Sequence, residues 1–197
     1  VAADACKDLL DKAEASGHKL YIEYADDSKT TIDPFLSYEN AFLKSEDAGN
    51  TEIIFARPSV NYQNYERNAT PNGSGGNGGF GVTQSLVDAF FMENGLPITD
   101  PDSKYEEKGF SGADEHRSGT KFETENGNCI TKQGTYNMYC HREPRFYVTV
   151  NFSGAYFPSE KRQYNFFNGG ADNNHTHDAP QNGYLMRKRV NPKDNIK

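Results

Sequence analysis

In its C-terminal half the chain runs His141-Arg142-Glu143-Pro144-Arg145-Phe146-Tyr147-Val148-Thr149-Val150-Asn151-Phe152. From Arg145 onward, apolar side chains alternate with more polar ones, which is the pattern of a half-buried strand. We therefore predict a strand over residues 145–152, with its apolar side chains in the core. Arg142, Glu143 and Arg145 stand at the entry to this strand, where we expect charged groups to pair and anchor the fold rather than contact a ligand.

Three helices are predicted from apolar spacing and capping residues. Residues 2–16 carry apolar side chains at helical intervals and end at Ser16-Gly17, which predicts an amphipathic helix with Cys6 buried. Asp33-Pro34 matches an N-cap followed by proline at the first helical position. We expect that helix to continue to about Lys44, and its inward side chains to be Phe35, Leu36, Phe42 and Leu43.

The third predicted helix covers residues 84–93, with Thr83 as its cap. Its apolar stripe consists of Leu86, Val87, Phe90 and Phe91. Asp88 lies on this helix and is expected to support the fold. Asn94-Gly95 then closes the helix.

Extended and irregular segments fill the rest of the chain. The compact apolar run 52–57 predicts a buried strand, and residues 184–190 predict a last strand-like segment. Residues 59–81, which include a glycine-rich run, predict one long loop. More than half of the chain is then irregular, so the predicted fold class is α+β with high irregular content, in a single domain. Residues 1–48 would be the end of a helical region and residues 49–197 a loop-rich region.

The composition limits the classes of function. The formal net charge of −7 disfavours a nucleic-acid binder, because such proteins carry a basic surface to meet phosphates. The chain has 13 Phe and 12 Tyr but no Trp, and we expect these rings to build the core where aliphatic residues are scarce. Three cysteines without a C-x-x-C pair indicate neither a zinc site nor a complete disulfide framework.

Motifs for nucleotide, acid–base or metal chemistry are weak. The glycine run 73–81 lacks the Gly-Lys-Ser/Thr end of a phosphate-binding loop, so it is either a flexible turn or backbone that passes close to a neighbour. Acidic residues between Asp88 and Glu115 could form the carboxylate pair of a glycoside hydrolase, but solvated surface charge explains them more simply. The segment 172–178, with His175 and His177, could hold a metal ion, yet it matches no defined template. We expect no cofactor and no metal.

Aromatic residues among amides are the more suggestive feature. A sugar offers an apolar face of C–H groups and a rim of hydroxyls, so its binding site pairs rings with amide and charged hydrogen-bonding groups. The runs 61–67, 156–157 and 164–168 supply these parts, although the same rings could simply fill the core. From them we select as candidate ligand contacts Tyr62, Asn64, Tyr65, Arg67, Tyr156, Phe157 and Asn168.

Three runs, in order along the chain, carry a resemblance to a known family. They are GGNGGFGVTQSLVDAF at residues 75–90, HREPRFYVTV at residues 141–150 and GYLMRK at residues 183–188. Together they resemble the SusD/RagB family of nutrient-binding outer-membrane lipoproteins of Bacteroidetes. The Arg-Glu-Pro-Arg-Phe block is the most specific of these elements. Phe80 and Val82 depart from the family's tryptophan and proline in the glycine loop.

The resemblance implies the middle and C-terminal part of a SusD-like fold that contains tetratricopeptide helices. It also implies a cell-surface protein without catalytic activity, which captures glycans, or sometimes peptides, and hands them to a SusC-like TonB-dependent transporter. Its location would be the outer membrane, reached through a lipid anchor that this chain lacks. An enzyme with a carboxylate pair remains the alternative from another class.

Overall fold

A computed structural model describes residues 1–56, 61–121, 129–173 and 178–193. Its helices and strands are α1 (Ala2–Ala13), α2 (Pro34–Leu43), α3 (Tyr62–Ala69), α4 (Gln84–Ala89), α6 (Pro144–Thr149), β1 (Val150–Asn151), β2 (Tyr156–Phe157), β3 (Arg162–Gln163) and β4 (Leu185–Met186). Short 3-10 turns lie at Glu14–Ser16, Glu46–Ala48, Asn72–Ser74, Pro101–Ser103 and Asn137–Tyr139. The rest of the described chain is turns and irregular segments, in agreement with the predicted fold class. Within the described residues, no helix is both long and apolar enough to cross a bilayer.

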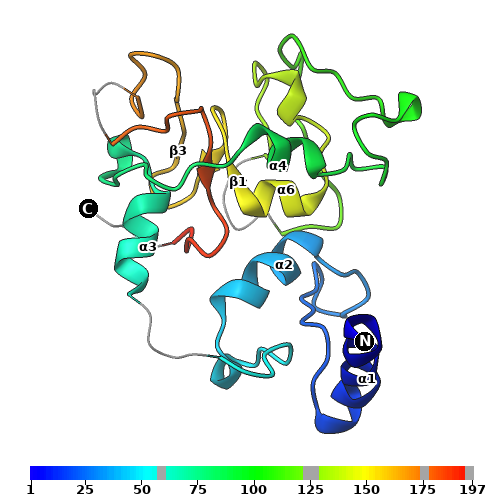
Figure 1. The fold of residues 1–197 in the computed structure, drawn as a ribbon. Coiled ribbons are helices and arrows are strands. Elements are labelled where there is room, and N and C mark those ends of the chain that lie inside the picture. The colour runs from blue at the N-terminus through cyan, green and yellow to red at the C-terminus, as the bar shows by residue number, and fades with distance from the viewer. Residues whose placement is uncertain (57–60, 122–128, 174–177, 194–197) are drawn as a thin grey trace.

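Helix α1 confirms the helix predicted over residues 2–16, because it continues into the Glu14–Ser16 turn and ends at Gly17 with φ 85°. It lies at the edge of the molecule, away from α4 and α6 (Figure 1). The prediction that Cys6 is buried is wrong: Cys6 is exposed, and α1 has no buried residue. Helical spacing identifies the apolar side of a helix, but it does not supply an element to cover that side.

Helix α2 begins as predicted. The Asp33 carboxylate accepts hydrogen bonds from the backbone N–H groups of Phe35 and Leu36 at 3.0 and 3.1 Å, and Pro34 occupies the first helical position. Phe35 and Leu36 are buried as expected. Phe42 is 37% exposed, so its predicted inward position is wrong; instead the Lys188 ammonium lies 3.8 Å from the centre of its ring.

The strand predicted over residues 145–152 is wrong for most of its length, because residues 144–149 form helix α6. Pro144 takes the first helical position, which favours a helix start. The presumed polar positions Tyr147 and Thr149 are buried along with Phe146 and Val148, so the alternation did not mark an outer face. Only Val150 and Asn151 are extended, as β1.

Two further predictions fail between residues 52 and 69. Described residues 52–56 form no strand, and Ile54 and Phe55 are 53% and 89% exposed; Arg57 lies outside the described residues. The loop predicted over residues 59–81 contains helix α3, whose N-cap Asn61 accepts from the backbone N–H of Asn64 at 3.1 Å. A short helix of polar residues has too few apolar positions to show a period.

The glycine-rich segment passes tightly against its neighbours. A Cβ added to Gly76 would collide with the carbonyl oxygen of Thr70, and one added to Gly73 would collide with Ala171 and the Asp172 carboxylate. Gly78 has φ 60°, a conformation that glycine adopts without strain. Of the two interpretations of this run, the structure therefore shows close backbone approach, which lets the run bridge α3 and the segment that follows β3.

Helix α4 is shorter than the predicted helix 84–93, although the Thr83 side chain caps it by accepting from the backbone N–H of Leu86. Val87 is fully buried, whereas Leu86 and Phe91 are 39% and 40% exposed. Strand β4 confirms a short extended piece of the segment predicted over residues 184–190. It pairs antiparallel with β1, Val150 opposite Met186.

Aromatic rings build the core, as the composition predicts. Phe146 and Phe152 stack with ring centres 5.4 Å apart, and the ring of Tyr139 lies 4.5 Å from that of Phe152. A second stack runs from Phe157 through Tyr164 to Phe166, with centres 5.2 and 5.4 Å apart. Strands β2 and β3 form the hairpin that carries this second stack. The boundary between residues 48 and 49 stays a prediction.

Candidate functional site

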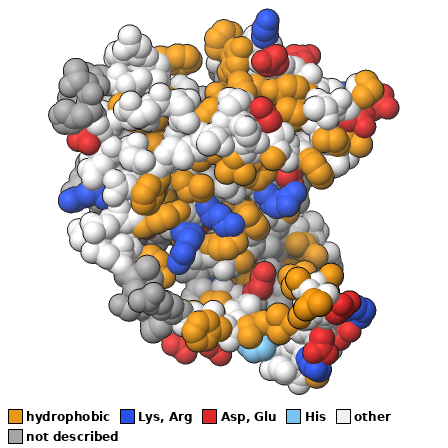
Figure 2. Space-filling model, viewed as in Figure 1, with side chains coloured by type: hydrophobic (Ala, Val, Ile, Leu, Met, Phe, Trp, Pro, Cys, Tyr) orange, Lys and Arg blue, Asp and Glu red, His pale blue; other side chains and the backbone are white. Residues whose placement is uncertain are grey.

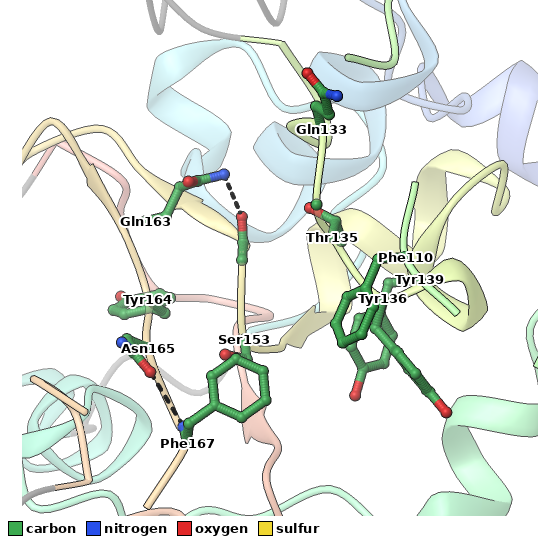
Figure 3. A pocket seen from close by; sticks show the side chains of 12 residues that line it. Phe110, Gln133, Thr135, Tyr136, Tyr139, Ser153, Gln163, Tyr164, Asn165 and Phe167 are labelled. Carbon is green, nitrogen blue, oxygen red and sulfur yellow. Dashed lines mark hydrogen bonds between the residues drawn. The ribbon is translucent and has the colours of Figure 1, made fainter. Parts of the chain in front are cut away.

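A cavity of about 640 Å³ lies between two irregular segments of the core-bearing part of the molecule. We call it the aromatic cleft. One wall comes from Phe110 and residues 133–139, the other from residues 163–167, and residues 153–154 line it between them. Figure 3 shows the rings of Phe110, Tyr136 and Tyr139 grouped on one side, facing the side chains of the hairpin segment.

The first wall consists of rings that contact one another. The rings of Phe110 and Tyr136 meet edge to face with their centres 5.4 Å apart, and Tyr136 and Tyr139 do so at 6.1 Å. Backbone pairing of Phe110 with Tyr136 aligns the two segments. Phe110 is 61% exposed, so part of its ring is available to a ligand.

The second wall supplies amides and a further exposed ring. The Gln163 amide donates to the carbonyl oxygen of Gly154 at 3.0 Å, and the Asn165 side-chain oxygen accepts from the backbone N–H of Phe167 at 3.2 Å. The Phe167 ring is 63% exposed. These hydrogen bonds fix the amides in place before any ligand arrives, which lowers the entropy cost of binding.

Arg162 holds the hairpin to the loop that follows it. Its guanidinium donates two hydrogen bonds to the fully buried carboxylate of Asp172, at 2.7 and 2.8 Å, and one to the Ser74 hydroxyl at 2.7 Å. Bidentate pairing of this kind fixes geometry as well as charge. The second wall is therefore joined to the glycine-rich segment.

The chemistry of the aromatic cleft is that of neutral donors and acceptors. The described residues of its lining are all Phe, Tyr, Gln, Asn, Ser, Thr or Gly, so among them no carboxylate is present to act as an acid or a base. Burial raises the pKa of Tyr139 and of Tyr164, and both phenols therefore stay protonated at neutral pH. Rings with fixed amides can bind and orient a polyhydroxylated molecule.

The predicted contacts on α3 lie outside the lining of this cleft. Tyr62, Asn64 and Arg67 are exposed on α3, whereas the half-buried Tyr65 packs on Phe80 and donates to the carbonyl oxygen of Lys188. Tyr62 is 51% exposed, and the Arg189 guanidinium lies 5.6 Å from its ring centre. Figure 2 shows Lys and Arg side chains standing among hydrophobic ones across the middle of the face on view.

The remaining predicted contacts lie on or near the hairpin. Tyr156 and Phe157 form β2 and are each 7% exposed, and the Phe157 ring belongs to the core stack, so neither offers a free face to a ligand. Asn168 is exposed and directly follows Phe167, beside the cleft. The structure thus places one of the seven predicted residues next to the cleft.

Sequence reasoning missed Phe110, Tyr136 and Phe167. Phe167 belongs to the run 164–168, which was singled out for its rings among amides. Phe110 and Tyr136 each follow a glycine within two positions. A ring near glycine and amide residues was the available signal, but only the fold shows that Phe110 and Tyr136 pair through their backbones.

The residues expected to support the fold are engaged in internal contacts. The buried Arg142 guanidinium donates to the carbonyl oxygens of Met138, Val87 and Phe90, at 2.9, 2.6 and 2.9 Å. It thereby ties α4 to the turn before α6. Asp88 accepts from the Gln84 amide at 2.8 Å.

Glu143 links the two sides of this turn. Its carboxylate accepts from the backbone N–H of Phe91 at 2.9 Å and pairs with the Arg145 guanidinium at 2.6 Å. Because Pro144 starts a helix, these charges stand at the entry to α6 rather than to a strand.

One group of metal-type ligands exists among the described residues. Oxygen and nitrogen atoms of Glu93, Glu115 and His141 lie within 4.8 Å of one another. The Arg117 guanidinium already lies 3.1 Å from Glu93 and 3.0 Å from Glu115, so a cation fills the position between the two carboxylates. Asp172 is taken by Arg162, and His175 and His177 of the predicted metal segment lie outside the described residues.

The family model described as the SusD family matches residues 39–197. The chain belongs to the SusD family. At the level of that family, its members bind glycans for nutrient uptake, are in general non-catalytic and are lipoproteins of the outer-membrane surface.

The two solved structures of BT4246 share the fold of this chain. A structure of BT4246 is 20% identical, with a TM-score of 0.63 over 96% of this chain, and its selenomethionine form gives 0.61. A SusD-like protein of Bacteroides fragilis, BF3747, is 22% identical over 92% of this chain and 32% of its own, with a TM-score of 0.46. The chain spans 35% and 36% of the length of the two BT4246 chains. No curated protein matches.

Proposed function

We propose that this chain binds glycans without cleaving them and that the aromatic cleft is where the glycan sits. The main support for this proposal is the cleft itself, in which exposed rings on both walls face fixed amides, and none of the described lining residues is a carboxylate. Rings cover the C–H faces of a sugar, and amides match its hydroxyls as both donors and acceptors. Membership of the SusD family supports the same class of ligand.

The wider setting is part of the proposal. A SusD-like protein with this function would stand on the outside of the outer membrane, held by a lipid anchor, and would pass its glycan to a SusC-like TonB-dependent transporter. In such a system the binding protein needs affinity without turnover, because cleavage belongs to other proteins. An open cleft lined by neutral side chains meets that need.

Affinity electrophoresis tests the location of the site. The gels would contain amylopectin, β-mannan, β-galactan or mixed-linkage β-glucan, and at least one should retard the protein. We expect Tyr136→Ala and Phe167→Ala each to weaken that retardation about five- to 150-fold, on the basis that a ring that stacks on a nucleic-acid base contributes about 1–3 kcal/mol. Tyr62→Ala is the matched control on α3 and should leave it unchanged.

Each alternative to this proposal predicts a different outcome of the binding experiment. If Tyr62→Ala abolishes retardation and Tyr136→Ala does not, the site lies on α3, which carries the candidates Tyr62, Asn64, Tyr65 and Arg67. If any of these glycans is shortened during incubation, the protein is an enzyme and the proposal of passive binding fails. If none is retained, glycan binding by this chain is wrong.

A further inference from the structure

The described residues that line the aromatic cleft are all uncharged. Its polar groups are amides, phenols and hydroxyls, which are chemically able to donate a hydrogen bond to a sugar hydroxyl or accept one from it, although the phenol oxygen of Tyr164 is buried away from a ligand. None of them can neutralise an anion. A site that recognises a carboxylate or a sulfate normally presents Arg or Lys to it.

The charged residues next to the lining in sequence are turned to other partners. Arg162 precedes Gln163, and its guanidinium pairs with Asp172 at 2.7 Å and with Glu160 at 2.6 Å. Lys132 precedes Gln133, and its ammonium lies 3.3 Å from the Asp114 carboxylate. Both cations flank the cleft, yet each is already paired with a carboxylate.

The electrostatic field of the whole chain also disfavours anionic ligands. With a formal net charge of −7, the protein repels a polyanion as it approaches. An anionic group that enters the cleft would lose water and gain no counter-charge, which costs free energy. A hydroxyl in the same position also loses its hydrogen bonds to water, but an amide of the lining can replace them.

We infer that the aromatic cleft selects uncharged glycans and rejects those that carry carboxylates or sulfates. The inference rests on the proposed function, and it narrows the ligand class of that site. The lining itself offers no positive charge to an anion. Arg162 and Lys132, which flank the lining in sequence, are already paired with carboxylates, so they do not offer one either.

A matched pair of ligands tests the selection. The probes are the four neutral polysaccharides named above and the same four after oxidation of their C6 hydroxyls to carboxylates. We expect oxidation to weaken retention at least tenfold, and the difference to persist at 0.3 M salt, where long-range repulsion is screened to within a few ångströms. Retention of an oxidised probe as strong as that of its parent, and abolished by Tyr136→Ala, would overturn the inference while leaving the proposed function intact.

A charge introduced into the cleft supplies the converse test. Gln163→Lys places an ammonium on the second wall, and we expect it to strengthen retention of the oxidised probes about tenfold, since hydrogen bonds to charged groups contribute about 1.5–3 kcal/mol. Gln181→Lys is the matched control, because its amide also donates to a backbone carbonyl at 3.0 Å but lies outside the cleft lining.

The two variants change the net charge equally, so they separate a local effect from a global one. Equal gains in both variants would mean that the total charge alone governs anion rejection, which contradicts the inference. Failure of the unmodified protein to retain any probe would overturn the proposed function and this inference with it.

Discussion

Helices α1 and α6 show opposite relations between sequence pattern and burial. Helix α1 has a clear helical period and forms as predicted, but none of its residues is buried. Helix α6 has an alternating pattern that predicts a strand, yet Phe146, Tyr147, Val148 and Thr149 are all buried on a helix. A periodic pattern arises when one face of an element is apolar and the other polar. A segment that is buried on all sides has no polar face, so it shows no such pattern.

The difference teaches where stability resides in this chain. Around α6 lie the stacked rings of Phe146 and Phe152, the buried guanidinium of Arg142 and the packed face of α2. Around α1 the stabilising contacts are solvent-exposed pairs such as Lys7 with Asp11, which contribute little. Substitutions near α6 should therefore unfold the protein, and substitutions on α1 should barely register.

Arg142→Met should have the largest effect. It leaves the carbonyl oxygens of Met138, Val87 and Phe90 without their donor, and we expect a loss of at least about 3 kcal/mol in the free energy of unfolding, measured by urea denaturation. Arg145→Met is the matched control: its side chain is 54% exposed and it should cost less than about 1 kcal/mol. Equal losses in the two variants would mean that Arg142 does not anchor α6.

A rise to alkaline pH should have the next largest effect on the free energy of unfolding, and it should act on the same region. Burial raises the pKa of Tyr139, Tyr147 and Tyr164 above the value of about 10 found in unfolded chains. The folded state holds these protons more tightly, so stability is complete below pH 10 and falls as pH rises toward the folded pKa. The slope is about 1.4 kcal/mol per pH unit for each such tyrosine.

Tyr164→Phe isolates one of these groups. Its hydroxyl is buried with no hydrogen-bond partner among the described residues, so its removal should leave stability at pH 7 unchanged or slightly raised. Urea denaturation between pH 8 and 11.5 should give a shallower alkaline slope for this variant. An unchanged slope would show that Tyr164 ionises as freely in the folded state as in the unfolded one.

Asp33→Ala should have an intermediate effect, because it uncaps α2, which packs against α6. The Asp33 carboxylate accepts from Phe35 and Leu36 and also from the backbone N–H of Lys121, and it is fully buried. We expect a loss of about 2 kcal/mol in the free energy of unfolding. Thr83→Ala removes the exposed cap of α4 and, as the comparison, should cost no more than about 1 kcal/mol.

Leu10→Ala should have the smallest effect. Leu10 is 72% exposed on α1, so the free energy of unfolding of this chain should change by less than about 0.5 kcal/mol. A loss above about 1 kcal/mol would show that the apolar side of α1 is covered in solution, and the contrast between α1 and α6 would then disappear.

Much of the local structure was predictable because its signals lie within a few residues. Asp33-Pro34 and Thr83 place helix starts through a side chain that bonds backbone two or three positions on. Gly17 ends α1 through its positive φ. In contrast, α3 and α6 escaped prediction, because one has too few apolar residues and the other too few polar positions to show a helical period.

The residue types of the proposed site were predictable from the sequence, but its place in the fold was not. The composition of rings and amides indicated sugar binding, and the run 164–168 supplied one wall of the cleft. The other wall joins Phe110 to Tyr136, which are brought together by backbone pairing across an irregular segment. Tyr156 and Phe157 share the same composition, yet the hairpin turns both into the core.

The sequence by itself determined the family, the caps of α2 and α4, and a core made of aromatic rings. These follow from covalent neighbours and from composition, which act at short range or on the chain as a whole. Only the tertiary structure decided which rings are buried, that Arg142 donates to carbonyls of two distant segments, and that the described residues lining the cleft are all uncharged. Those outcomes depend on which distant segments meet, because a side chain becomes buried or hydrogen-bonded only when its partners from other segments are in place.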